Sequence, residues 1–266
     1  MSFISYERKN RLVLAKYQRI DTAKNYDILA GIFNSVPKII ITLPTSSPLP
    51  EEIERIIRAD INRAVSDENF DRVYNVLRLV YLHQKDYCQG LSYIASFVLC
   101  FIDENIAPSV ILYILEKYGA NVWTHSLVGL HVEIRVLKTI LEQEAPSVLE
   151  YMTKHGIRFE FFIQKYLYTL FINIFPQDDL IEFFIQFLQD PETYLFKVII
   201  EIMKGLISSG KTEITEVLYY LAEARLPSVE KFSREYDFKS LRIKNQAEIE
   251  LELALQNLNV EDSDEE

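Results

Sequence analysis

Apolar residues recur at intervals of three and four positions through nearly every window of this 266-residue chain. Such spacing places side chains on one face of an α-helix, whereas a half-buried strand alternates every second residue. A stripe also follows Ser66, which we expect to cap a helix. The clearest stripe, which indicates a core-facing helix, consists of Leu195, Val198, Ile199, Ile202, Met203 and Leu206. We therefore predict an all-α fold, a single multi-helix domain with no β-sheet of consequence.

Proline and glycine usage agree with this prediction. The chain contains only 7 glycines, whereas average usage gives about 19 in this length. Phosphate-binding loops and tight strand–helix turns depend on glycine, so an α/β nucleotide-binding enzyme is disfavoured. Six prolines stand directly ahead of helical patterns, where the missing amide proton costs nothing: Pro50, Pro108, Pro146, Pro176, Pro191 and Pro227.

Proline-rich and charged segments also indicate how the chain is divided. We expect an N-terminal helical segment over residues 1–41, which can belong to the main domain, and a Pro/Ser/Thr-rich connector over 42–50. The helical body is expected over 51–235 and a C-terminal helix over 236–260. Residues 261–266 are almost all acidic and are predicted to form a disordered tail.

Charge and cysteine content restrict the partners and the compartment. The formal net charge is −11, and the body stays acidic without its C-terminal tail, so we expect no nucleic acid partner. The longest apolar stretch, 93–102, is too short to cross a membrane. Two cysteines form no disulfide framework, and the first residues lack the apolar core of a secretory signal. We expect a cytoplasmic protein.

Residues 205–212, Gly-Leu-Ile-Ser-Ser-Gly-Lys-Thr, match the P-loop pattern G-x-x-x-x-G-K-[ST]. A P-loop must follow a β-strand, so that backbone amides and the next helix converge on the phosphates. The segment before Gly205 instead carries the helical stripe described above. We interpret the match as a helix end, and a nucleotide-binding protein as the least favoured hypothesis.

The four histidines are scattered, and none has a second histidine or a carboxylate at the i, i+4 spacing of a helical metal site. We expect no metal site and no cofactor bound by this chain itself.

Two short segments carry more chemistry. The first, Ile57-Arg58-Ala59-Asp60-Ile61-Asn62-Arg63, lies in a predicted helix and spaces a carboxylate three residues before an arginine. Such a carboxylate can restrict the rotamers of the guanidinium. The second, Tyr87-Cys88-Gln89-Gly90-Leu91-Ser92, opens an apolar helix that we expect to run to residue 102. We expect its glutamine in the first helical turn, projecting from the surface.

Together, I-x-x-D-x-x-R followed by Y-x-Q-G in an all-helical chain resembles the TBC domain, the catalytic module of Rab GTPase-activating proteins. The resemblance covers about residues 51–210 and implies that Arg63 is an arginine finger and Gln89 a glutamine finger. It implies that Asp60 fixes the arginine, and that Tyr87 and Gly90 shape the turn presenting the glutamine. Ile57 is the first residue of the motif.

The resemblance further implies a Rab-family small GTPase as partner, which carries the GTP and Mg²⁺, and a role in vesicle traffic. Membrane association is then expected only through the lipid-anchored GTPase. Several positions depart from the family pattern. Ser92 replaces Asn, Asp86 replaces Gly, Ala64 replaces Thr, Tyr166 replaces Trp, and residues 182–185 lack an Asp. The alternative hypothesis is therefore a catalytically weak or inactive TBC-like adaptor that binds a GTPase or another protein.

Overall fold

The computed structural model describes residues 23–39, 48–124 and 126–263, and in these ranges it contains α-helices and two 3₁₀ turns but no strand. The all-α prediction is confirmed. In chain order the elements are α3 (Tyr26–Ser35), α4 (Glu51–Ala64), η2 (Asp67–Asn69), α5 (Phe70–Gln84), α6 (Leu91–Val98), α7 (Ala107–Tyr118), η3 (Ala120–Trp123), α8 (Val128–Glu144), α9 (Pro146–Lys154), α10 (Phe159–Thr169), α11 (Gln177–Phe187), α12 (Pro191–Ser208), α13 (Ile214–Ala222) and α14 (Phe238–Ser263).

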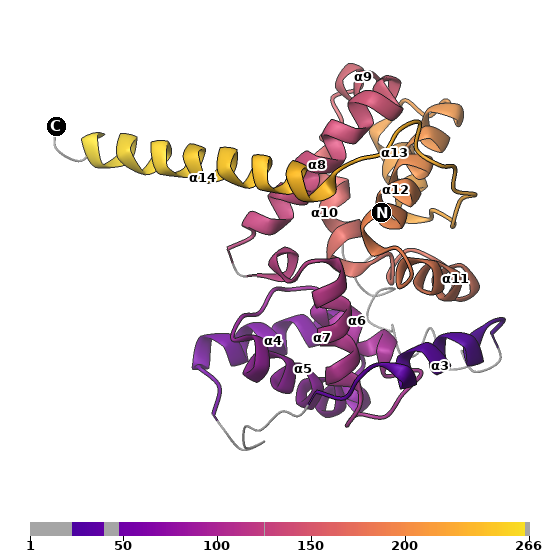
Figure 1. Cartoon of the computed structure of the whole chain (residues 1–266), viewed down its shortest axis with the longest axis vertical. Coiled ribbons are helices and arrows are strands. Elements are labelled where there is room, and N and C mark those ends of the chain that lie inside the picture. The colour runs from indigo at the N-terminus through magenta and orange to yellow at the C-terminus, as the bar shows by residue number, and fades with distance from the viewer. Residues whose placement is uncertain (1–22, 40–47, 125, 264–266) are drawn as a thin grey trace.

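Helices α3 to α7 gather at one end of the molecule and α8 to α13 at the other, as Figure 1 shows. One continuous hydrophobic core joins the two ends, from Leu29 in α3 to Ile249 in α14. Helix α10 contacts α6 across the middle, and α11 contacts α3. The first half of α14 packs on α8, whereas the rest extends away from the body.

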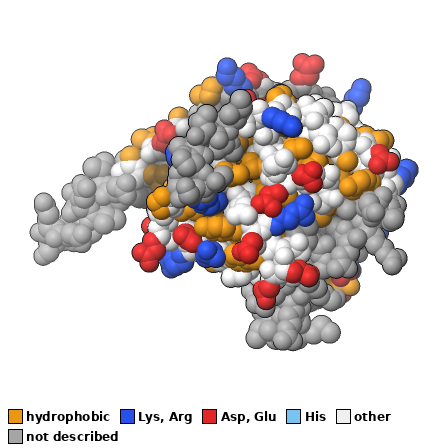
Figure 2. All heavy atoms as spheres, turned by 90° about the horizontal axis from the view of Figure 1, so that it is seen from below, with side chains coloured by type: hydrophobic (Ala, Val, Ile, Leu, Met, Phe, Trp, Pro, Cys, Tyr) orange, Lys and Arg blue, Asp and Glu red, His pale blue; other side chains and the backbone are white. Residues whose placement is uncertain are grey.

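Helix α4 illustrates how the sequence sets an element. Pro50 precedes it and three glutamates fill its first turn, where their charges interact favourably with the helix dipole. Ile57, Asp60, Ile61 and Ala64 form its buried face, at the spacing that an amphipathic helix requires. The exposed face is polar, so α4 packs against α5 and α6 with one side only. Figure 2 views the molecule from the end formed by α3 to α7 and shows acidic and basic side chains interspersed with hydrophobic ones.

Two helices begin or end away from their predicted limits. The apolar helix from Leu91 stops at Val98 rather than at 102, because Arg72 of α5 donates hydrogen bonds to the carbonyls of Leu99 and Ile102 and satisfies acceptors at this end. The helix expected directly after Ser66 begins at Phe70, preceded by the 3₁₀ turn η2. Ser66 makes no capping hydrogen bond to the backbone.

Pro227 does not open a helix, contrary to our prediction, and residues 223–237 are irregular. Carboxylates of distant helices hold this segment instead. Asp179 of α11 accepts a hydrogen bond from the backbone amide of Leu226, and Glu144 of α8 accepts one from that of Ser233. These bonds satisfy amides that a helix would otherwise pair internally.

The termini and the connector are described in part. Residues 1–22 and 40–47 lie outside the described residues, so most of the predicted connector does too. Helix α14 continues to Ser263, into the range predicted as a disordered tail. None of the helices in the described ranges combines the length and the apolar character that a bilayer crossing requires.

The P-loop match at 205–212 is a helix end. Asp190 caps α12, which runs without interruption from Pro191 through Gly205 to Ser208. The chain then turns at Gly210, where φ is +66°. The loop geometry that cradles phosphates after a β-strand is therefore not formed by these residues.

Candidate functional site

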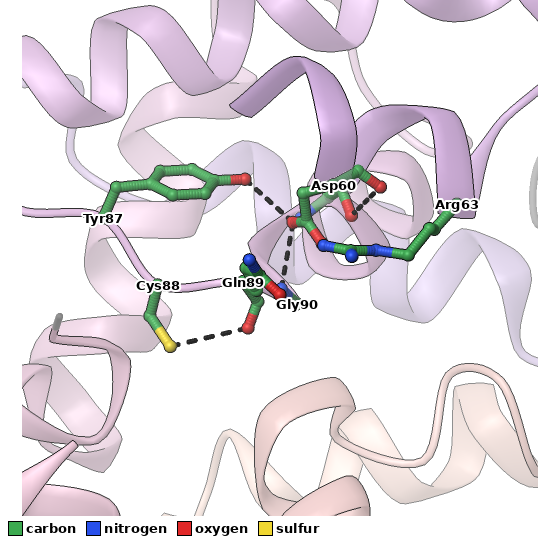
Figure 3. A network of polar contacts seen from close by, with 7 residues as sticks. Asp60, Arg63, Tyr87, Cys88, Gln89 and Gly90 are labelled. Carbon is green, nitrogen blue, oxygen red and sulfur yellow. Dashed lines mark hydrogen bonds and ion pairs between the residues drawn. The ribbon is translucent and has the colours of Figure 1, made fainter. Parts of the chain in front are cut away.

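Asp60 joins the two sequence motifs. Its side chain is buried in α4, and its Oδ2 accepts hydrogen bonds from the hydroxyl of Tyr87 at 2.8 Å, the backbone amide of Gly90 at 2.9 Å and that of Ser92 at 3.1 Å. Figure 3 shows the Tyr87 and Gly90 bonds converging on this carboxylate. A helix begins with unpaired amides, so Asp60 acts as the cap of α6 from a different helix. One buried side chain thus fixes the whole turn of residues 87–92.

Arg63 lies three residues further along α4, on its exposed side. Its Nη2 is 3.4 Å from Oδ1 of Asp60, and 48% of its side chain is exposed. This distance is long for a charge-assisted hydrogen bond. Asp60 therefore interacts weakly with the guanidinium and strongly with the turn of 87–92. The three-residue spacing between Asp60 and Arg63 in the sequence did not indicate this difference.

Tyr87 is buried with its hydroxyl on Asp60. Burial raises the pKa of Tyr87 well above its usual value, and the neighbouring Asp60 carboxylate raises it further. The phenol therefore stays protonated and remains a donor to Asp60. Ile57, the first residue of the α4 motif, is completely buried beside Asp60 and anchors the inner face of the helix.

Gln89 and Gly90 form the turn directly before α6, so Gln89 lies outside the first helical turn in which we expected it. The cause is Gly90, whose φ of +109° prevents the helix from extending backward. A Cβ on Gly90 would also lie 3.3 Å from both Cβ and the carbonyl oxygen of Tyr168. Only glycine fits this position, and it leaves the Gln89 side chain exposed.

Tyr168 of α10 supports this turn from the other side. Its Cβ and carbonyl oxygen lie against Gly90, and this carbonyl accepts a hydrogen bond from Nε1 of the buried Trp123 at 3.1 Å. Burial raises the pKa of Cys88 to about 11, so this thiol is neutral at physiological pH. The turn that carries Gln89 is therefore held between Asp60 on α4 and Tyr168 on α10.

Arg63 and Gln89 border one hollow of about 570 Å³, and Figure 3 shows Arg63 extending from α4 toward the turn that bears Gln89. Helix α10 forms much of the remaining wall. Among the described residues, those that line the hollow are Ile56, Arg63, Tyr87, Cys88, Gln89, Gly90, Tyr93, Leu127, Gln164, Lys165, Tyr168, Thr169 and Asn173. The two sequence-predicted fingers thus share an open concave surface, which can receive groups from a partner.

Sequence reasoning missed two residues of this site and the contacts of a third. Tyr168 and Lys165 lie about 75 to 80 positions beyond Gln89, and neither stands in a motif, although Tyr166 of the same helix is a position of the family pattern. Ser92 stands where the family pattern has Asn, yet it is bound to Asp60 through its amide and through its hydroxyl, which donates to the Asp60 carbonyl at 3.2 Å. Tyr166, another of the departures, is buried and donates a hydrogen bond to the carbonyl of Leu221.

Within the described part of the chain, no three His, Cys, Asp or Glu side chains lie close enough together to hold a metal ion. The hollow offers arginine, lysine, amide and hydroxyl groups, which recognise oxygen-rich anionic and polar partners.

Relatives of known name match most of this chain. Growth hormone-regulated TBC protein 1-A of Danio rerio is 26% identical over 197 residues, which cover 69% of this chain and 52% of the relative. The GTPase-activating protein GYP5 of Saccharomyces cerevisiae is 24% identical over 178 residues, 64% of this chain and 20% of that protein. The chain spans about half the length of the growth hormone-regulated relatives it matches, and less of GYP5.

The fold has a counterpart among solved structures. The RabGAP TBC domain of the Chlamydomonas flagellum superposes with a TM-score of 0.55 at 13% identity, covering 91% of this chain and 77% of that one. The family model described as the Rab-GTPase-TBC domain matches residues 41–208, which include Asp60, Arg63 and the whole 87–92 turn. This protein belongs to the RabGAP-TBC family.

Proposed function

We propose that this protein is a GTPase-activating protein for a Rab-type small GTPase. The observation that carries the proposal is the placement of Arg63 and Gln89, from two separate segments, on one exposed hollow. A small GTPase hydrolyses GTP slowly because charge on the transferred phosphoryl group is poorly compensated and the attacking water is poorly oriented. A guanidinium such as that of Arg63 can compensate the charge, and an amide such as that of Gln89 can orient the water.

In this proposal Arg63 enters the partner's active site and neutralises charge on the phosphoryl oxygens. An arginine supplied in this way accelerates hydrolysis about 10³-fold or more, which corresponds to about 4 kcal/mol of activation free energy. Gln89 orients the attacking water. The GTPase carries the GTP and Mg²⁺, and this chain contributes only side chains. Regulation of vesicle traffic, and recruitment to membranes through the lipid-anchored GTPase, follow from that partner.

The fixed turn supports this assignment. The backbone of Gln89 is held in place before any partner arrives. The amides of Gly90 and Ser92 donate hydrogen bonds to Asp60. Tyr168 packs against Gly90 from the other side. A group that is already positioned loses little conformational entropy in the transition state. Ser92 and Tyr166, which depart from the family pattern, each donate a hydrogen bond to a backbone carbonyl.

Single-turnover GTP hydrolysis on a panel of Rab GTPases tests the proposal. We expect wild type to stimulate at least one, and Arg63→Ala and Gln89→Ala each to lower the stimulated rate about 10²-fold or more. Arg63→Lys should rescue little, because an ammonium cannot contact two oxygens as a guanidinium does.

Two exposed residues outside the hollow provide matched controls. Arg55 lies on the same helix as Arg63, Gln143 lies on α8, and both side chains are exposed. The control variants are Arg55→Ala and Gln143→Ala. Both should keep the wild-type rate. Binding of a GTPase without any stimulation by wild type would contradict the proposal and identify the protein as an adaptor.

A further inference from the structure

Lys165 is a second cation in the hollow that holds the two proposed fingers. It belongs to α10, its side chain is half-buried, and it lines the hollow together with Arg63 and Gln89. Among the described lining residues, Arg63 and Lys165 are the charged ones, and both are positive. The remaining titratable side chains there are three tyrosines and Cys88, and burial raises the pKa of Tyr87, Tyr168 and Cys88, so these groups stay neutral. The lining thus offers two cationic side chains, although Arg63 lies 3.4 Å from the buried carboxylate of Asp60 and the chain as a whole carries a net charge of −11.

Burial of Lys165 has an electrostatic cost. Desolvation lowers its pKa from 10.5 to about 8, because an ammonium loses solvation free energy when it leaves water. An apolar residue at this position on α10 would fill the same space without that cost. An anionic oxygen entering the hollow would stabilise the ammonium form of Lys165.

Hydrogen bonds connect the part of α10 that contains Lys165 with the turn that follows this helix. The hydroxyl of Thr169 lies 2.9 Å from the carbonyl oxygen of Lys165 and 2.9 Å from Oδ1 of Asn173. Gln164 and Asn173 add amide groups to the same wall of the hollow. A cation flanked by amide and hydroxyl groups is a common arrangement for binding carboxylate or phosphate oxygens.

We propose that Lys165 binds an anionic oxygen that the partner inserts into the hollow beside Arg63. The oxygen belongs to the transferred phosphoryl group of the bound nucleotide or to a carboxylate on the GTPase surface, and the contact is the same chemistry in both cases. This inference rests on the proposed function, since it assumes that the GTPase docks over the hollow.

The affinity of wild type, Lys165→Met, Lys165→Arg and Lys138→Met for the stimulated GTPase tests it. Methionine keeps the length and volume of the side chain, arginine keeps the charge, and Lys138 is an exposed lysine of α8 outside the hollow. Loss of a charge-assisted contact should weaken binding about tenfold to a hundredfold in Lys165→Met. Lys165→Arg should recover most of it, and Lys138→Met should bind as wild type. Melting curves verify that each variant is folded.

The nucleotide state separates the two sources of the oxygen. If Lys165 contacts the transferred phosphoryl group, the loss is confined to the GTPase loaded with GDP and aluminium fluoride, which mimics that group. If it contacts a surface carboxylate, the loss is equal when the GTPase carries GDP alone. Equal affinities of Lys165→Met and Lys138→Met in both states would overturn the inference.

A second readout does not depend on any GTPase. In ¹³Cε-lysine NMR spectra, the Lys165 resonance is assigned by its absence in Lys165→Met, and inorganic pyrophosphate is then titrated. We expect pyrophosphate to shift that resonance and raise the Lys165 pKa, with Lys138 unaffected. If wild type binds no GTPase, the proposed function fails, and this titration alone decides whether the anion site exists. An unchanged Lys165 resonance would then reject it.

Discussion

At the scale of single residues, Asp60 is the side chain that accepts the hydrogen bonds on which the site's turn depends. One oxygen of its carboxylate accepts from Tyr87, Gly90 and Ser92, and all three donors are buried. A buried donor that loses its acceptor costs more than the lost hydrogen bond was worth, because water cannot replace it. Fold and proposed activity therefore depend on the same carboxylate.

Asp60→Ala should lower the free energy of unfolding by about 3 kcal/mol or more, since it leaves three buried donors without an acceptor. Urea denaturation measures this loss. Glu52→Ala removes an exposed carboxylate from the same helix and should cost no more than about 1 kcal/mol, which is what one charge gains from the helix dipole. Comparable midpoints for the two variants would show that Asp60 does not hold the 87–92 turn.

Lys165 gives stability a pH dependence with a definite sign. Its pKa is about 8 in the folded chain and 10.5 as the unperturbed value, so between these pH values the unfolded chain binds more protons. Stability from this group therefore rises as pH increases from 8 to 10.5. Other groups titrate in the same range, so the measured quantity is the difference in unfolding free energy between wild type and Lys165→Met. A difference that stays constant across this window would mean that desolvation does not lower the Lys165 pKa.

At the scale of elements, the turn between α5 and α6 depends on close contact with α10. Gly90 has a φ of +109° and lies against Tyr168, where a Cβ would be 3.3 Å from two atoms. Gly31 on the exposed side of α3 offers a contrast, because a Cβ there would meet nothing within 4 Å. The same substitution should therefore have opposite effects at the two positions.

Gly90→Ala should destabilise the protein by about 2 kcal/mol, from backbone strain and contact with Tyr168. It should also displace Gln89 and lower stimulated GTP hydrolysis about tenfold or more, mainly through kcat. Gly31→Ala should leave hydrolysis unchanged and stabilise the protein by about 0.5 to 1 kcal/mol, because alanine favours a helix. Thermal melts and single-turnover rates report both effects. Wild-type hydrolysis by Gly90→Ala would exclude a role for this turn in placing Gln89.

Elements and motifs differed in how far the sequence could predict them. The stripe from Leu195 to Leu206 predicted α12, because helical periodicity is local information. Arg63 and Gln89 each stand in a short motif, so they could be selected before the structure was known. Residues 223–237 were mispredicted, since Asp179 and Glu144 hold them from distant helices. Tyr168 and Lys165 had no signal, because only tertiary packing brings α10 to the hollow.

At the scale of the whole molecule, a buried ion pair attaches the C-terminal helix to the body. Arg242 of α14 contacts Glu133 of α8 through Nε–Oε1 at 2.6 Å and Nη2–Oε2 at 3.1 Å, and its Nη1 lies 2.7 Å from Oε1 of Glu192 in α12. Burial raises the pKa of Glu133, while Arg242 acts in the opposite direction. A second pair between the same two helices, Arg135 and Glu252, is much more exposed.

The two pairs allow a matched comparison of buried and exposed charges. Arg242→Met should destabilise the protein by about 3 to 5 kcal/mol, because Glu133 stays buried without its cation. Arg135→Met should cost less than about 1 kcal/mol, since water screens the exposed pair. Replacing both partners, Arg242→Met with Glu133→Met, should recover much of the loss, because no charge is then left buried. Urea denaturation gives the three values, and hydrogen exchange shows whether α14 detaches locally. If Arg242→Met were no more costly than Arg135→Met, packing of Phe238, Leu241 and Ile249 alone would hold α14 on the body.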